Sequence, residues 1–119
     1  MARVKASQAE LEAAKLSLAA QTTKAWLNLI EARQQHALAE RTAQAYRDNQ
    51  DALETRFKRG LTEGFDLRRI RTQTASAEAD VATRLRAIDR ATRSLENVLG
   101  RYPAGSIESL ATLPDLPEN

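Results

Sequence analysis

The sequence predicts an all-α protein, a long antiparallel α-helical hairpin of the coiled-coil type with an extended C-terminal tail. Of its 119 residues, 22 are alanine and 15 are leucine, whereas valine and isoleucine together number 7 and aromatic residues make up 4%. Strands favour β-branched and aromatic side chains, so this composition disfavours a β-sandwich. Glycine and proline are confined to a short central segment and to the tail, which leaves two long stretches free to form helices.

The first helix is expected over about residues 3–59, because neither glycine nor proline occurs before Gly60. Its residues form a seven-residue repeat with a companion line four residues on, which is typical of a coiled-coil seam. A second apolar line runs beside the seam, so this helix is expected to have neighbours on two sides. The seam comprises Leu11, Leu18, Ala25, Ala32, Ala39, Tyr46 and Leu53, with Lys15, Thr22, Leu29, His36, Ala43, Gln50 and Phe57 as companions; the second line comprises Leu16, Ala20, Leu27, Ile30 and Leu38, with Trp26 beside it.

The turn is expected over residues 60–64. Gly60 suits the left-handed conformation that often follows the last turn of a helix, and Thr62 or Glu63 is expected to begin the second helix. Asp66 then falls in the first turn of that helix, where a carboxylate is favoured by the helix dipole. Three apolar side chains are expected to close over the tip as a plug, namely those of Phe57, Leu61 and Phe65.

The second helix is expected over about residues 65–99, so the hairpin spans residues 1–100. A 59-residue helix is roughly 88 Å long and a 35-residue helix about 52 Å. About twenty N-terminal residues therefore lack a partner helix within the hairpin. Because they include Leu11, Leu16 and Leu18, the chain is expected to self-associate or to be a fragment of a larger helical assembly. The seam of the second helix comprises Val81, Ile88 and Leu95, with Ile70, Ala77, Ala91 and Val98 as companions and Arg84 interrupting them.

The remaining features indicate neither catalysis nor a cofactor. Residues 101–119 are expected to form an extended connector, because prolines interrupt them. The chain has no cysteine and one histidine, His36, and a single seam histidine is more often a packing residue than a metal ligand. Trp26 and Tyr46 are interpreted as packing residues. No nucleophile–base set and no phosphate-binding loop is evident, so an enzyme is not expected.

Four segments in order along the chain resemble the TolC-like family of outer-membrane efflux proteins, and most closely its lipoprotein branch, which serves multidrug pumps. Two lie in the first helix, one is the tip and one ends the second helix, so the resemblance covers nearly the whole chain. The tip segment matches the family's aromatic-x-x-Gly-Leu motif and the Asp-Val/Leu pair that follows it. The segments are AELEAAKLSLAAQ (9–21), AWLNLIEAR (25–33), RFKRGL (56–61) with FDL (65–67), and LENVLGRYP (95–103).

The resemblance implies a passive export conduit. In that family three chains form an outer-membrane channel with a long periplasmic α-helical tunnel, and each chain contains two related repeats. This chain is then expected to be a fragment that lies in the periplasm and supplies part of the tunnel wall. The membrane-embedded part of the channel would be missing from it, so the fragment itself would make no membrane contact. Its partners would be a periplasmic adaptor (membrane-fusion) protein, an inner-membrane pump reached through the adaptor, and further copies of the channel chain.

The resemblance also assigns roles at the tip. The adaptor-docking role falls on Arg59, Gly60 and Leu61, and the role of tunnel gate and ion-selectivity residue falls on Asp66. Two residues depart from the family pattern: Arg59 stands where a small apolar residue is common, and Gly64 stands where a helix former is usual.

Other interpretations of the same residues stay open at this point. Asp66 can be explained by helix capping alone. The basic cluster at the tip can be a solvated, salt-bridged surface, a docking surface or, least favoured, a nucleic-acid site, since a net charge of +2 does not indicate nucleic acid. The whole hairpin can also be a stand-alone soluble coiled-coil scaffold. The basic cluster comprises Arg56, Lys58, Arg59, Arg68, Arg69 and Arg71.

Overall fold

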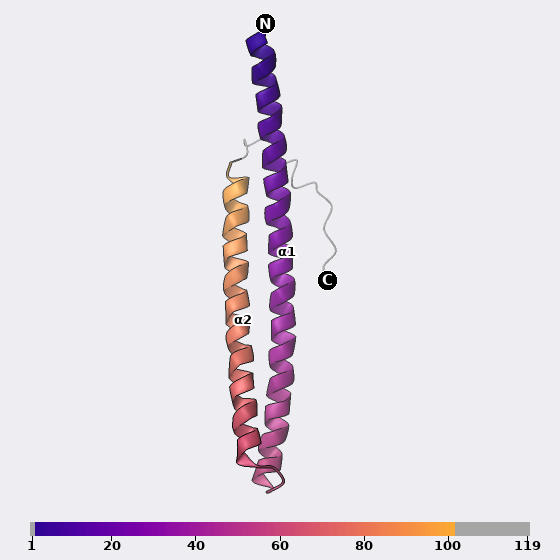
Figure 1. The fold of residues 1–119 in the computed structure, drawn as a ribbon, viewed down its shortest axis with the longest axis vertical. Coiled ribbons are helices and arrows are strands. Elements are labelled where there is room, and N and C mark those ends of the chain that lie inside the picture. The colour runs from indigo at the N-terminus through magenta and orange to yellow at the C-terminus, as the bar shows by residue number, and fades with distance from the viewer. Residues whose placement is uncertain (1, 102–119) are drawn as a thin grey trace. The chain divides into compact units, whose positions relative to one another are not determined.

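The computed structural model describes residues 2–101, which form two α-helices joined by a short turn (Figure 1). Helix α1 runs over Ala2–Lys58 and helix α2 over Gly64–Leu99. No strand occurs within the described range. The predicted all-α hairpin is therefore confirmed. Except for Arg101, the predicted C-terminal connector lies outside the described residues.

The helices form two compact units, each built from a piece of α1 and a piece of α2. One unit joins α1 up to Ile30 with α2 from Arg90 onward, and the other is Glu31–Asp89, which contains the turn. Within the second unit α1 and α2 run antiparallel on either side of the turn, as Figure 1 shows.

The seam of the second unit is built from small residues on α1 and larger ones on α2. Ala39 and Ala43 are buried, and Ala43 has no exposed surface at all. On α2 the same unit buries Leu67, Ile70 and Thr74, which lie nearer the turn. Methyl side chains on α1 let the facing helix pack at close range. The core is accordingly thin, and it lies along the seam that the heptad pattern predicts.

Polar contacts across the seam hold the two helices of this unit in register. Arg47 Nε donates to Glu78 Oε1 at 2.8 Å, and Arg71 Nη2 donates to Glu54 Oε1 at 3.3 Å. One heptad separates the two pairs on each helix, and within each pair the two residues are equally distant in sequence from the centre of the turn. Because exposed pairs contribute only about 0–1 kcal/mol each, their main effect is on alignment.

The first unit covers only part of its α1 segment. Ala25 and Leu29 are buried on α1 and Leu95 on α2. By contrast, every side chain in the range 3–17 is exposed, and Leu16 keeps 74% of its surface. These described residues confirm the prediction that the hairpin leaves the N-terminal part of the first helix exposed.

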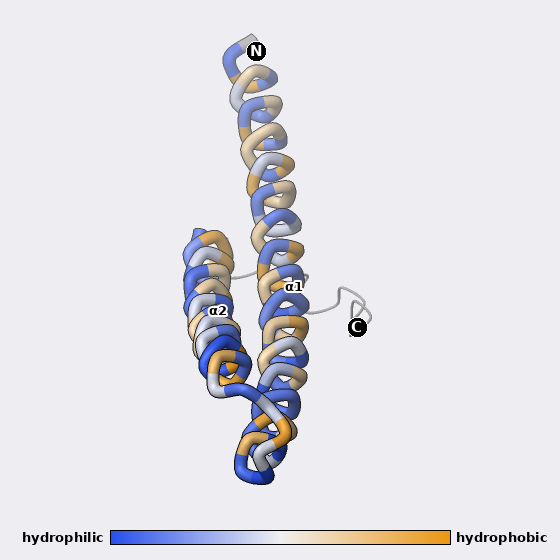
Figure 2. Tube along the Cα trace, turned by 60° about the horizontal axis from the view of Figure 1, so that its bottom comes forward, coloured by the Kyte–Doolittle hydropathy of each residue, from blue (hydrophilic) through white to orange (hydrophobic). Residues whose placement is uncertain are grey.

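The second apolar line of α1 is also largely uncovered. Leu27 and Leu38 are about half exposed, and only Ile30 is partly covered. Trp26 keeps 45% of its surface, so the described hairpin covers only part of its side chain, and its role as a packing residue stays a prediction. Figure 2 shows hydrophobic and hydrophilic residues alternating along the trace of α1.

Candidate functional site

The backbone of the tip is fixed by a glycine cap at the end of α1. Gly60 has φ +72°, the left-handed region that glycine adopts without strain. The Gly60 N–H donates to the carbonyl of Phe57 at 3.0 Å, and the Leu61 N–H donates to the carbonyl of Arg56 at 2.9 Å. This pair of bonds is the Schellman motif, which uses two carbonyls that the helix end would leave unpaired. The predicted left-handed cap at Gly60 is confirmed.

The start of α2 does not demand a glycine in the same way. Helix α2 begins at Gly64, just after the Thr62 and Glu63 positions expected from the sequence, and Gly64 has no positive φ. A Cβ at Gly64 would lie 3.6 Å from Phe57 Cε2, an ordinary contact distance. Asp66 is half-buried in the first turn of the helix, where its carboxylate faces the positive end of the dipole.

The apolar side chains of the turn remain open to solvent. Leu61 is 66% exposed, Phe65 63% and Phe57 45%. The predicted apolar plug is therefore wrong: a loop of five residues between the two helices does not fold these side chains over one another. We refer to Phe57, Leu61 and Phe65 as the tip apolar group.

The basic residues around this group carry an excess of positive charge. Residues 54–71 hold six basic and three acidic side chains, a net charge of +3, whereas the whole chain carries +2. Among the ion pairs of the described residues, only Arg71 of the predicted basic cluster takes part, through Glu54. The other five side chains are exposed. We call them the tip cations: Arg56, Lys58, Arg59, Arg68 and Arg69.

The pKa of the Glu54 carboxyl is lowered by its hydrogen bonds and by the positive charges near it. The Gln50 amide donates to Glu54 Oε1 at 3.2 Å, and the Arg71 guanidinium donates through Nε and Nη2 at 3.3 Å. These bonds, with the positive charges of Arg71 and Lys58, lower the pKa of Glu54 below its ordinary 4.5, although partial burial acts in the opposite direction. Glu54 is thus held as a carboxylate that links α1 to α2.

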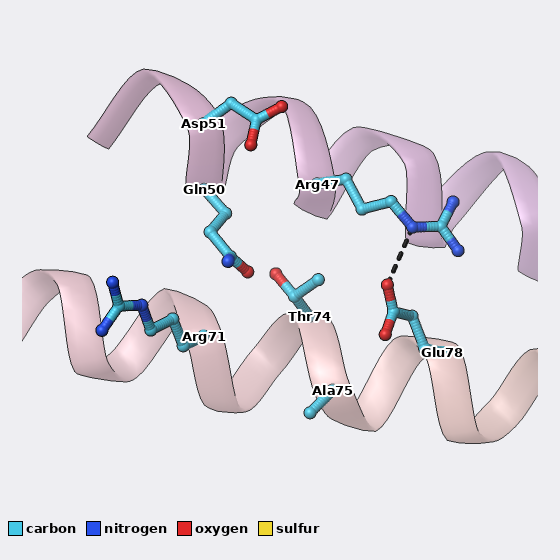
Figure 3. A pocket seen from close by; sticks show the side chains of 7 residues that line it. All are labelled: Arg47, Gln50, Asp51, Arg71, Thr74, Ala75 and Glu78. Carbon is cyan, nitrogen blue, oxygen red and sulfur yellow. Dashed lines mark hydrogen bonds and ion pairs between the residues drawn. The ribbon is translucent and has the colours of Figure 1, made fainter. Parts of the chain in front are cut away.

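A shallow hollow lies between the helices above this pair. It has a volume of about 330 Å³. Figure 3 shows Arg47 paired with Glu78 along one side, with Gln50 and Thr74 facing each other between the helices. Two basic and two acidic side chains line the hollow, so their charges balance and give no preference for an anion or a cation. The lining residues are Arg47, Gln50, Asp51, Arg71, Thr74, Ala75 and Glu78.

Metal binding and membrane crossing find no support in residues 2–101. His36 Nε2 lies 3.6 Å from Glu40 Oε1 on the next helical turn, and this part of the chain has no group of three potential ligands placed to hold a metal ion. Neither of the described helices has a stretch both long and apolar enough to cross a bilayer.

The structure brings the predicted docking residues together but keeps Asp66 on the other helix. Arg59, Gly60 and Leu61 lie on consecutive positions of the cap, whereas Asp66 belongs to α2. Sequence reasoning missed the Arg47–Glu78 pair. Both residues lie next to seam positions, the usual place for ion pairs between helices of a coiled coil, so aligning the two seams about the turn could have found it.

Residues 1–101 match the family model described as outer membrane efflux protein. Neither the curated protein sequences nor the solved structures gave a match.

Proposed function

Because the chain belongs to the outer membrane efflux protein family, we propose that its hairpin forms tunnel wall in the periplasmic part of a TolC-like efflux channel of the lipoprotein branch. The channel would assemble from three chains and act as a passive conduit, with an inner-membrane pump supplying the energy. The hairpin itself would carry no chemistry. Its role is to provide a rigid surface on which neighbouring helices and a periplasmic adaptor protein pack.

The uncovered face of α1 is the observation that carries the wall assignment. Leu16, Leu27 and Leu38 are each at least half exposed in the hairpin, and Trp26 lies beside them. Exposed apolar groups that recur along one helix mark a surface for another protein element. Helices of adjacent hairpins in a channel wall would cover this surface.

The tip supports the adaptor-docking part of the proposal. The cap holds Leu61 outward on a backbone fixed by two hydrogen bonds, with Arg59 and Gly60 directly before it. A rigid, exposed apolar side chain at the end of a hairpin loses little entropy on binding. We propose that Leu61 is the apolar anchor and that Gly60 allows close backbone approach.

Binding of a purified soluble adaptor protein to the immobilised chain tests the docking role. Leu61→Asp should weaken binding at least about tenfold, because a carboxylate would have to be desolvated in the contact. Leu61→Met, which keeps the apolar volume, should bind like the wild type, and circular dichroism should show equal helicity for both variants. Equal affinities for Leu61→Asp and the wild type would remove Leu61 from the interface.

Asp66 is proposed as the gate residue of the assembled channel. Its half-buried carboxylate lies within the first turn of α2, close enough to the turn for copies from three chains to meet at a tunnel mouth. In single-channel recordings, Asp66→Asn should reduce the preference for cations, because it removes one negative charge per copy. Unchanged ion selectivity would leave helix capping as the role of Asp66.

A further inference from the structure

The tip cations are not explained by the stability of the hairpin alone. Arg56 and Lys58 lie in the last turn of α1, where a positive charge interacts favourably with the negative end of the helix dipole. Arg68 and Arg69 lie near the opposite, positive end of α2, where a cation gains nothing from the dipole. Neither Arg68 nor Arg69 belongs to an ion pair of the described residues.

Arg68 and Arg69 share a helix face with one member of the tip apolar group. They follow Phe65 by three and four residues, the two spacings at which side chains on a helix are neighbours. All three are exposed. The surface of α2 at the tip is therefore an aromatic ring bordered by two guanidinium groups, and the turn adds Arg59 and Leu61 on either side of Gly60.

We propose that this surface docks an acidic protein partner, one that presents an apolar contact ringed by carboxylates. This inference rests on the proposed function, since it states the chemistry of the adaptor tip that would dock here. Complementary charge around an apolar centre speeds association and fixes orientation. An exposed apolar centre favours a protein over a nucleic acid, whose phosphate backbone offers it no apolar counterpart, and a local charge of +3 is small for binding a polyanion.

The test compares two double variants of the chain for binding to a soluble adaptor protein at low and high salt. Arg68→Gln/Arg69→Gln removes two tip cations, and Arg90→Gln/Arg93→Gln removes the same charge from exposed positions of α2 in the other unit. At ~50 mM NaCl the tip variant should bind about five- to tenfold more weakly than the wild type, and this difference should vanish near ~500 mM NaCl, where exposed charges are screened. The control variant should match the wild type throughout.

Thermal unfolding of the same variants separates docking from a structural role. Removing two of several crowded positive charges relieves repulsion, so the tip variant should unfold at the same or a higher temperature than the wild type. Weaker binding together with undiminished stability supports the inference. A tip variant with wild-type affinity at low salt would overturn it, while leaving the Leu61 docking role intact.

If no adaptor protein binds the chain, that result counts against the proposed function and does not test the charge of the partner. A pair of designed probes then tests the inference directly. One probe is a helical hairpin with leucine at its tip flanked by four glutamates, and the other replaces these with glutamines. The chain should bind the acidic probe more tightly, and Arg68→Gln/Arg69→Gln should erase the preference. Equal binding of the two probes, or tighter binding to duplex DNA or phosphatidylglycerol vesicles than to the acidic hairpin, would contradict an acidic protein partner.

Discussion

Gly60 and Gly64 bracket the same turn, but only one of them is required by its backbone. Gly60 has a positive φ, and a Cβ added there would meet no atom within 4 Å. Any cost of replacing it is therefore backbone strain and not a clash. Gly64 lies in the first turn of α2 with a helical backbone, so glycine there mainly adds flexibility to the unfolded chain.

Opposite effects on stability are expected for alanine at these two positions. Gly60→Ala should lower the free energy of unfolding by about 1–2 kcal/mol, because the left-handed conformation is strained for residues with a Cβ. Gly64→Ala should raise it by about 0.4–1 kcal/mol, because the unfolded chain loses freedom that the native helix does not need. Urea unfolding followed by circular dichroism measures both. A Gly60→Ala variant as stable as Gly64→Ala would contradict the cap geometry.

At the scale of single residues, the sequence predicts structure where a backbone conformation favours one residue type. Gly60 was predicted because a helix ending in Lys58-Arg59-Gly60 has the composition of a cap. The exposure of Leu61 was expected for a docking residue at the tip, but that of Phe65 was not predicted, because hydrophobicity alone favours burial, whereas the short turn supplies no surface on which Phe65 could be buried.

At the scale of the helices, heptad residues form the buried seam, whereas ion pairs beside the seam align the two helices. The heptad positions of α1 from Leu18 to Leu53 are all buried or half-buried, as the repeat predicts. Thr74 was missed in the α2 seam because it is polar. Its hydroxyl donates to the carbonyl of Ile70 at 2.8 Å and lies 3.3 Å from the carbonyl oxygen of Tyr46, so it can be buried without an unsatisfied group.

The ion pair between Glu54 and Arg71 should make hairpin stability depend on pH. Because the pKa of Glu54 is lower in the folded chain than its ordinary 4.5, the folded state favours the carboxylate. This stabilisation is complete above the unfolded pKa and is lost as the pH falls through the folded pKa. Glu54→Gln should thus be less stable than the wild type at pH 7 and equal to it once Glu54 is protonated.

Denaturant unfolding between pH 7 and pH 2 measures this difference. The same comparison in an Arg71→Gln background is the control, because the guanidinium is one cause of the lowered pKa. The pH-dependent difference should shrink there without vanishing, since the Gln50 amide still donates to Glu54. A difference between wild type and Glu54→Gln that is constant with pH would contradict the ionic link.

At the scale of the whole molecule, the described hairpin leaves apolar surface that no described residue covers. Val4, Leu11 and Leu16 are 57–74% exposed at the N-terminal end of α1, and the second apolar line continues the uncovered surface. The mismatch in helix length predicted this from the sequence. Neither the sequence of one chain nor its hairpin defines the residues that cover this surface, because in the proposed channel they would belong to other helices.

The molar mass of the chain in solution, measured by light scattering over a range of concentrations, tests the central claim most directly. Circular dichroism on the same samples reports helicity. If the hairpin is wall material whose exposed apolar line needs neighbouring helices, the mass should rise with concentration to two or three times the 13.2 kDa of one chain, with helicity retained. A fully helical species of 13.2 kDa at every concentration would contradict the account and favour a self-contained scaffold.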